Sequence, residues 1–160
     1  MSAISLREQS ARLLLFSAIV AMISASCTSV NTETTLKDAY ADSFMIGCAV
    51  NPLHTGGHLE QATDLILEHF NAISPENCLK PEAVQPRPGV WTFDDADEFV
   101  KFGEEHDLWM LGHTLVWHNQ TPSFYWEKPD GTPKTREELI ETMRVHIETV
   151  AGRYAGRIDA

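Results

Sequence analysis

The side chains best suited to chemistry in this chain gather in residues 112–118, which read Gly-His-Thr-Leu-Val-Trp-His. The pattern predicts a buried strand, and because side chains alternate along a strand, His113, Leu115 and Trp117 would share one face. An imidazole beside an indole, followed by amides such as Gln120, is typical of a sugar-binding wall, where the ring stacks on a pyranose. The alternative is a core strand whose polar atoms are satisfied internally.

Two further blocks stand upstream. Residues 71–77 read Asn-Ala-Ile-Ser-Pro-Glu-Asn and are followed by Lys80. Residues 82–97 read Glu-Ala-Val-Gln-Pro-Arg-Pro-Gly-Val-Trp-Thr-Phe-Asp-Asp-Ala-Asp. With residues 112–118, these blocks resemble glycoside hydrolase family 10, the endo-1,4-β-xylanases, and the resemblance runs unbroken from about residue 44 to residue 160.

The resemblance implies a fold, a chemistry and a set of substrate-binding residues. The family folds as a (β/α)8 TIM barrel and hydrolyses xylan with retention through two glutamates, so the function expected by resemblance is that of a glycosidase without a cofactor or a metal. Xylan or xylo-oligosaccharide would be the partner. The substrate-binding residues carried over from the family are Glu76, Asn77, Lys80, His113, Trp117 and Gln120.

Each of these residues takes a role from the resemblance. Glu76, Asn77 and Lys80 would bond hydroxyls on the glycone side, while His113 and Trp117 would line the subsite of the sugar to be cleaved. Gln120 would bond the next sugar, and the peptide bond after the histidine is often cis in the family. The structural alternatives are loop capping by the asparagine and solvation of the glutamate and the lysine. Pro81 departs from the tryptophan often found beside that lysine.

Neither family glutamate is among these 160 residues. The family's acid/base follows strand four in a Trp-Asp-Val-Val-Asn-Glu segment, which would begin where the sequence reaches residue 160, and its nucleophile follows strand seven. We therefore expect an N-terminal, truncated part of a xylanase that is inactive alone, with no catalytic residue of its own. The alternatives are a non-catalytic carbohydrate-binding surface protein and a truncated gene product without a function.

The order of the elements indicates an α/β fold. The predicted elements are a strand at 44–50, a helix at 58–70, a strand at 70–74, a helix from Asp94, a strand at 108–117, a helix from Thr135 to Gly156 and a strand that starts at Ile158. Such alternation predicts parallel βαβ units, which suit a doubly wound sheet or a barrel. The resemblance selects the barrel. Because a whole barrel needs about 250 residues, residues 41–160 suffice for roughly the first three βα units and the start of strand four.

Two helices carry a clear apolar face. In the first, Asp94 would cap the helix with Phe93 as its staple residue. The predicted inner face of this helix consists of Ala96, Phe99, Val100 and Gly103. In the second, residues 135–138 read Thr-Arg-Glu-Glu, which is a capping box. Its predicted inner side chains are Leu139, Met143, Ile147, Val150 and Tyr154.

The N-terminal segment reads as a targeting sequence. Arg7 and Arg12 precede an apolar stretch at 13–23, and small residues lead to Cys27. This pattern predicts a signal peptide over residues 1–27, of the lipoprotein type with an acylated Cys27, although an ordinary cleavage just before it is the alternative. Residues 28–40 would be a tether. The protein is therefore expected to be exported, as a membrane-anchored lipoprotein at the cell surface or in the periplasm, or otherwise secreted.

The net charge and the spacing of histidines and cysteines bear on which partners the protein can bind. The formal net charge of −11 argues against nucleic acid and against an anionic membrane surface, so the only membrane contact expected is the lipid anchor. His54 and His58 are spaced for a metal, but no carboxylate or cysteine completes a ligand set, and no metal site is predicted. Cys48 and Cys78 are read as two small buried thiols, with pairing as the alternative.

Overall fold

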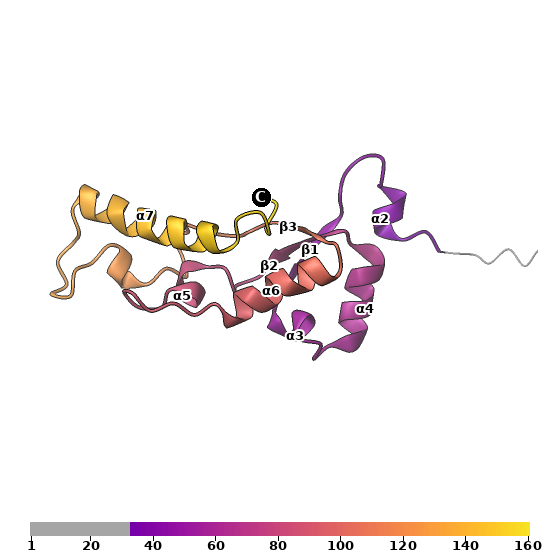
Figure 1. The fold of residues 1–160 in the computed structure, drawn as a ribbon, viewed down its shortest axis with the longest axis horizontal. Coiled ribbons are helices and arrows are strands. Elements are labelled where there is room, and N and C mark those ends of the chain that lie inside the picture. Colours follow the sequence, from indigo (N-terminus) through magenta and orange to yellow (C-terminus); the bar gives the residue numbers. More distant parts are fainter. Residues whose placement is uncertain (1–32) are drawn as a thin grey trace, which may run out of the picture. The chain divides into compact units, whose positions relative to one another are not determined.

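The computed structural model describes residues 33–160 (Figure 1). The predicted signal peptide and Cys27 lie outside the described residues. Within residues 33–160, no helix is both long enough and apolar enough to cross a membrane.

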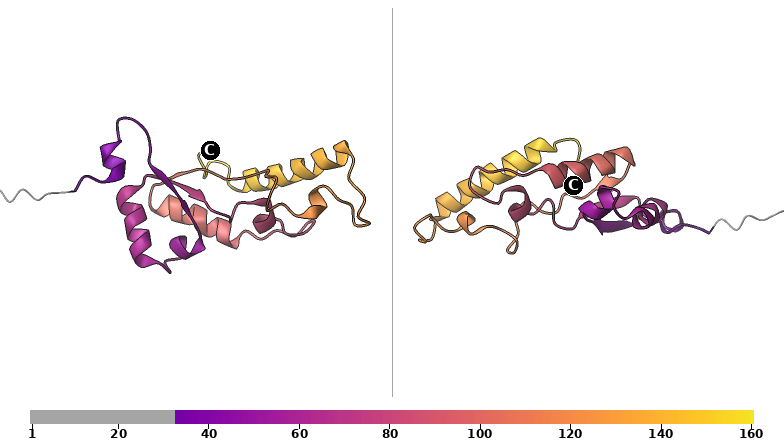
Figure 2. Two further views of the ribbon diagram at one scale, coloured as in Figure 1. Left: turned by 180° about the vertical axis from the view of Figure 1, so that it is seen from behind. Right: turned by 90° about the horizontal axis from the view of Figure 1, so that it is seen from below.

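Three parallel strands form the sheet, in the order β1-β2-β3. They are β1 (Gly47–Val50), β2 (Ala72–Pro75) and β3 (Trp109–Met110), and the register places Gly47 opposite Ala72 and Ala72 opposite Trp109. Because all three strands run the same way, their carboxyl ends meet at one edge of the sheet. The first three predicted strands are thus present and parallel. Figure 2 shows the same fold from behind and from below.

The third strand is much shorter than the predicted 108–117. Its last sheet bond to β2 runs from the Leu111 N–H to the Ile73 carbonyl, at 2.9 Å. The neighbouring strand β2 ends at Pro75, which has no N–H to donate, and the chain then turns away. Residues beyond Leu111 therefore have no strand to pair with on that side, and they form an irregular loop instead.

A fourth parallel segment begins at the other side of β3. The Ala160 N–H donates to the Met110 carbonyl at 3.3 Å, and the Gly112 N–H donates to the Ala160 carbonyl at 2.6 Å. These two bonds bracket Leu111 in the pattern of a parallel pair. The predicted start of strand four therefore has the expected hydrogen bonds, although the segment is too short to count as a strand.

The helices alternate with these strands. Their bounds are α2 (Leu36–Ala39), α3 (Pro52–Thr55), α4 (Glu60–His69), α5 (Pro81–Val84), α6 (Asp94–Glu105) and α7 (Arg136–Arg153), with a short 3-10 helix η1 (Ser123–Tyr125) before α7. Helix α2 occupies the end of the predicted tether. It is held against α4 because the Lys37 ammonium donates to the Leu67 carbonyl at 2.6 Å and the Leu36 N–H donates to His69 Nδ1 at 3.2 Å. The last residues of the predicted tether are therefore helical and contact α4.

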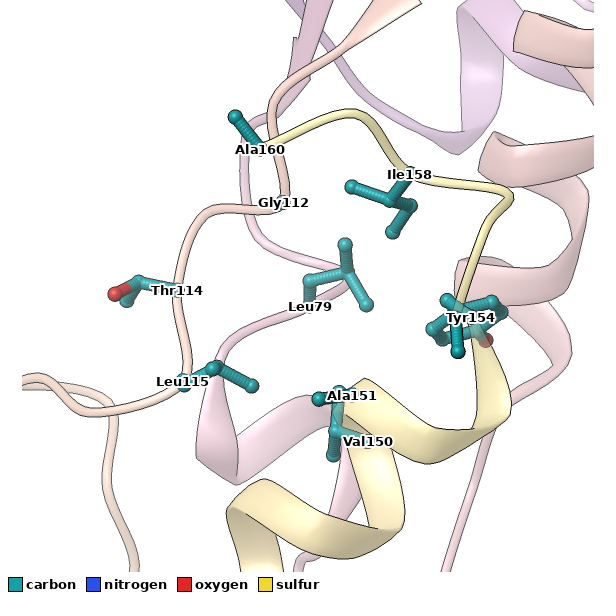
Figure 3. Close-up of a pocket in the computed structure, with 10 residues that line it drawn as sticks. Leu79, Gly112, Thr114, Leu115, Val150, Ala151, Tyr154, Ile158 and Ala160 are labelled. Atoms are coloured by element: carbon teal, nitrogen blue, oxygen red, sulfur yellow. The ribbon is translucent and has the colours of Figure 1, made fainter.

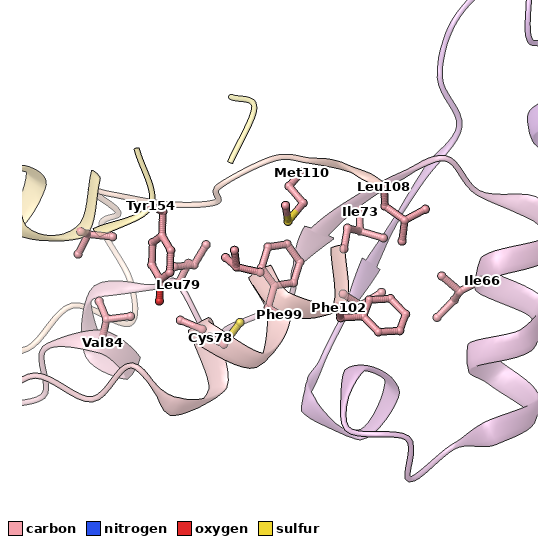
Figure 4. Close-up of a cluster of buried hydrophobic side chains, with 14 residues drawn as sticks. Ile66, Ile73, Cys78, Leu79, Val84, Phe99, Phe102, Leu108, Met110 and Tyr154 are labelled. Atoms are coloured by element: carbon pink, nitrogen blue, oxygen red, sulfur yellow. The ribbon is translucent and has the colours of Figure 1, made fainter. Parts of the chain in front are cut away.

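The core lies between α6 and one face of the sheet (Figure 4). The predicted inner face of α6 is confirmed, since Phe99 and Val100 are at most 1 % exposed, and Phe102 joins them. From the sheet, Ile73 and Met110 pack against this helix (Figure 4). Cys48 and Cys78 are free thiols, as predicted, but only Cys78 is buried, and Cys48 is half-buried.

Helix α4 buries less than its pattern predicts. The apolar residues of this segment are spaced as one helical face, which predicts that they are buried together; they are Leu59, Ala62, Leu65, Ile66 and Phe70. Within the helix only Ile66 is buried, and Leu65 is 53 % exposed. Leu59, which stands at the N-cap position, is 42 % exposed and makes no side-chain cap. The apolar spacing predicts the helix correctly but overstates how wide its buried stripe is.

The first turn of α6 differs from the predicted helix cap and contacts the end of α7. Asp94 is the first helical residue, and the N-cap position belongs to Phe93, which forms no side-chain cap. Another carboxylate of the first turn, Asp97, accepts from the Arg153 guanidinium and from the Tyr154 hydroxyl, the latter at 2.8 Å. The acidic first turn of α6 thus ties the helix to the end of α7, in addition to complementing the helix dipole.

Helix α7 begins as its sequence predicts. The Thr135 hydroxyl accepts from the Glu138 N–H, and the Glu138 carboxylate accepts from the Thr135 N–H at 2.7 Å, so the capping box is confirmed. The expected inner side chains are buried only toward the C-terminal end, where Val150 is 4 % and Tyr154 is 3 % exposed. The helix ends at Arg153, three residues before Gly156, which has a positive φ of 75°.

Gly103 provides a test of this packing. A methyl group added there would overlap the Met110 side chain, with Cγ only 2.7 Å away. We expect Gly103→Ala to lower the free energy of unfolding by about 1–3 kcal/mol, because the core is overpacked. Combining it with Met110→Ala should cost less than the sum of the two single changes, which chemical denaturation measures.

Gly152, near the end of α7, is the matched control. A methyl group there meets nothing within 4 Å, so Gly152→Ala should leave stability unchanged or raise it by up to about 1 kcal/mol. Equal losses for both glycine variants would contradict the packing explanation.

Candidate functional site

Three of the predicted sugar-binding residues meet beyond the carboxyl end of β2. The Lys80 ammonium donates to Asn77 Oδ1 at 2.9 Å and also to Gln120 Oε1. Gln120 Nε2 donates to the same Asn77 oxygen at 3.1 Å. These three side chains, called the amide–lysine cluster below, are joined although Gln120 lies 40 residues after the lysine.

The backbone holds the two loops of this cluster together. The Glu82 N–H donates to the Gln120 carbonyl at 2.9 Å, and Gln120 itself adopts a left-handed φ of 51°. Lys80 is the N-cap residue of α5, and Pro81 occupies the first position of that helix. A proline suits this position, since its missing N–H would have no helical partner there. The departure at Pro81 from the family pattern therefore starts a helix and leaves the lysine in the cluster.

Glu76 stands beside the cluster at the end of β2 and is exposed. Its backbone N–H donates to the Val50 carbonyl of β1 at 2.8 Å, and its Oε2 accepts from Asn51 Nδ2 at 3.0 Å. Asn51 is not among the residues predicted from the sequence. The signal for it was an asparagine followed by a proline directly after a strand, which reads only as a turn or a cap.

His113 and Trp117 also lie together, but on a loop and not on a strand. Their rings meet edge to face with centroids 5.5 Å apart, and the indole is 40 % exposed. The expected cis peptide bond between His113 and Thr114 is confirmed. The His118 ring also contacts this indole, with centroids 4.7 Å apart, so Trp117 is held between two histidines while part of it stays exposed.

Leu115 does not share the face of these two rings, which corrects the prediction from strand alternation. Its side chain turns inward to an apolar cavity of 210 Å³ that lies between this loop and the last turns of α7 (Figure 3). Leu79, Val150 and Ile158 line the same cavity. Leu115 therefore packs on the inner side of this loop, while the side chain of Trp117 remains exposed on its outer side.

The other candidates for chemistry have structural roles. His54 Nδ1 accepts from the Asn51 N–H at 3.2 Å as part of a capping box, and no group of three or more His, Cys, Asp or Glu side chains in residues 33–160 is placed to hold a metal ion. Asp97 and Glu104 pair with arginines, and these hydrogen bonds lower the pKa of both carboxyls. Neither carboxyl is thereby poised to act as a general acid.

Known proteins match this chain in sequence and in structure. The family model for glycosyl hydrolase family 10 matches residues 35–160. An endo-1,4-β-xylanase B of Paenibacillus barcinonensis is 42% identical over 125 residues, which is 78% of this chain and 36% of that protein. A β-1,4-xylanase of Dictyoglomus thermophilum is 40% identical over 125 residues, covering 78% of this chain and 33% of its own length.

Solved structures agree with the sequence matches. A family 10 endoxylanase retrieved from a sugarcane soil metagenome superposes with a TM-score of 0.74 at 44% identity, covering 79% of this chain and 38% of that one. The chain thus spans about a third of the length of the relatives it matches. Its three parallel strands and their helices correspond to part of the α/β barrel of this family, as the resemblance predicts. By sequence and by fold, the chain belongs to glycosyl hydrolase family 10.

Proposed function

We propose that this chain carries the glycone half of a xylan-binding site. The observation that carries the proposal is the amide–lysine cluster at the carboxyl ends of the strands, which is where barrel enzymes place their sites. The relatives are named as xylanases, which supports a β-1,4-linked xylose chain as the ligand.

The hydrogen bonds of the cluster leave the groups that a sugar needs. Lys80 has three N–H donors and uses two within the cluster. Asn77 accepts twice on its Oδ1, and its Nδ2 has no partner among residues 33–160. Glu76 uses one carboxylate oxygen for Asn51. Free donors next to a free acceptor suit the neighbouring hydroxyls of a pyranose, and Trp117 offers an apolar surface for the ring.

Replacing the indole tests this function. Trp117→Ala should weaken the binding of xylotriose to the 160-residue chain about five- to thirtyfold. Losing one aromatic contact and its buried apolar area costs about 1–2 kcal/mol. Isothermal titration calorimetry measures the change.

The control is Trp126→Ala, because that indole is similarly exposed, at 44 %, but lies after η1 and outside the predicted sugar-binding residues. It should leave the Kd unchanged. Equal losses for both tryptophan variants, or no binding by the unaltered chain, would refute the proposed function.

We also propose that the chain alone binds but does not hydrolyse xylan, and that it is exported with a lipid on Cys27. The support for export is the pattern of arginines, apolar residues and small residues before that cysteine. The proposed place is the cell surface or the periplasmic face of a membrane, reached through the anchor alone.

Acylation of Cys27 is tested by metabolic labelling. A bacterial host fed a labelled fatty acid should label the unaltered chain, and Cys27→Ser should lose the label, because the thiol is the acylated group. The free thiol of Cys48 is the matched control, and Cys48→Ser should keep the label. Label of equal strength on the Cys27 variant would exclude the lipoprotein.

A further inference from the structure

Asn51 stands at the carboxyl end of β1, directly opposite the end of β2. The pair Val50 and Pro75 closes the register of these two strands, so the next residues, Asn51 and Glu76, are neighbours across the sheet edge. The Asn51 Nδ2 donates to Glu76 Oε2 at 3.0 Å. We propose that Asn51 is a positioning residue that holds the Glu76 carboxylate in the orientation in which it accepts from a sugar hydroxyl, an inference that rests on the proposed function.

The Asn51 amide has only one orientation open to it. Asn51 is the N-cap of α3, and its Oδ1 accepts from the Leu53 N–H at 3.1 Å. Its backbone N–H donates to His54 Nδ1 at 3.2 Å, which completes a capping box. With the oxygen committed to the helix, the planar amide must present its NH₂ group to Glu76.

Glu76 is held at two points and open at a third. Its backbone N–H donates to the Val50 carbonyl at 2.8 Å, and its Oε2 accepts from Asn51. The other oxygen, Oε1, has no partner among residues 33–160, and the residue is exposed. One carboxylate oxygen is thus fixed by Asn51 and the other remains available to a ligand. Because the side chain is already restricted to few rotamers, Glu76 loses less conformational entropy when a sugar binds.

The capping box also accounts for the histidine that invited a metal interpretation. His54 Nδ1 is an acceptor, so it carries no proton and is engaged with the Asn51 backbone. The imidazole therefore supports the residue that supports Glu76. This chain of contacts couples helix α3 to the proposed sugar site.

Two substitutions separate positioning from helix capping. Asn51→Ser and Asn51→Asp both keep a good N-cap acceptor for α3, but neither keeps the NH₂ group. The aspartate variant also places a second carboxylate against Glu76. Both should bind xylotriose about three- to tenfold more weakly than the unaltered chain, because the carboxylate must then be ordered during binding. Circular dichroism should show that both variants stay folded.

A reversed pair gives the rescue. In the double variant Asn51→Asp with Glu76→Gln, the new amide at position 76 can donate to the new carboxylate at position 51. In chemical denaturation, the double variant should be more stable than the sum of the two single changes predicts. Relief of the repulsion between the two carboxylates also produces such coupling, so the cycle is repeated with Asn51→Ser and Glu76→Ala, in which no like charges meet. A residue that served only as a helix cap would show additive effects in this second cycle.

The outcomes separate this inference from the proposed function. If the unaltered chain binds xylotriose and both Asn51 variants bind equally well, the positioning role is overturned and the proposed function stands. If the unaltered chain does not bind, the proposed function fails. The interaction between Asn51 and Glu76 is then tested by the stability cycle alone. Additive effects in that cycle would overturn the inference whatever the sugar does, and coupling with weakened binding would support it.

Discussion

Lowering the pH from 7 to 4 should remove about 3 kcal/mol of folding free energy through His146 alone. This side chain is 0 % exposed and packs between the Trp91 and Tyr125 rings. Its Nδ1 lies 3.0 Å from Gln85 Oε1, an oxygen that also accepts from the Tyr125 hydroxyl. Since that oxygen can only accept, Nδ1 carries the proton and Nε2 is left as a buried lone pair without a partner in the described part of the chain.

Burial disfavours the charged imidazole and lowers the pKa of His146 from 6.5 to about 4. Because the folded-state pKa is the lower one, the unfolded chain binds a proton first as the pH falls. The neutral histidine's contribution is therefore fully present above about pH 6.5 and is lost as the pH falls toward 4. Salt-bridged carboxyls such as Asp97, whose pKa is also lowered, lose their contribution at still lower pH.

The measurement is the free energy of unfolding by urea at several pH values. The slope between pH 6.5 and 4 should flatten in His146→Gln, which cannot titrate and still offers a polar group to Gln85. His58→Gln, at an exposed loop position, is the control and should keep the slope. An NMR titration that puts the His146 pKa near 6.5 would contradict the explanation directly.

The sequence predicts best those elements whose signals are local. The capping box at Thr135 and the apolar spacing of α6 lie within one turn or one helix, and both appear as expected. The strand predicted at 108–117 fails because its length depends on a neighbour, and β2 stops at Pro75. Helix α2 likewise depends on contacts with α4 some 30 residues away, which no local pattern announces.

The same division applies to the candidate site. The family motifs identified Asn77, Lys80 and Gln120, and the structure brings them into hydrogen-bond contact. Asn51 and His146 were missed because each acts through one tertiary partner, and an isolated asparagine or histidine carries no spacing that reveals such a partner. Such polar pairs, exposed at Asn51 and buried at His146, become visible only when the fold sets the distance between their atoms.

A second large effect concerns catalysis: the purified 160-residue chain should release no reducing ends from xylan above the buffer rate. Retaining hydrolysis needs two carboxyls about 5–5.5 Å apart, one to protonate the leaving oxygen and one to attack the anomeric carbon. At the proposed site, the carboxylate that the structure offers is Glu76, whose Oε2 is held by Asn51. One carboxylate that faces glycone hydroxyls cannot both donate the proton and form the covalent intermediate.

The assay compares the unaltered chain with Glu76→Gln over long incubations with xylan. Both should stay at the level of buffer, while binding of xylotriose distinguishes them. The substitution replaces one of the two carboxylate oxygens with an NH₂ donor, and the oxygen that remains is the one that accepts from Asn51. Turnover well above buffer that disappears in Glu76→Gln would overturn this expectation, because it would assign to Glu76 a role in bond cleavage. Turnover that survives the substitution would instead require a second carboxyl near the site, and the remaining Asp and Glu residues of the described chain would then be the ones to replace in turn.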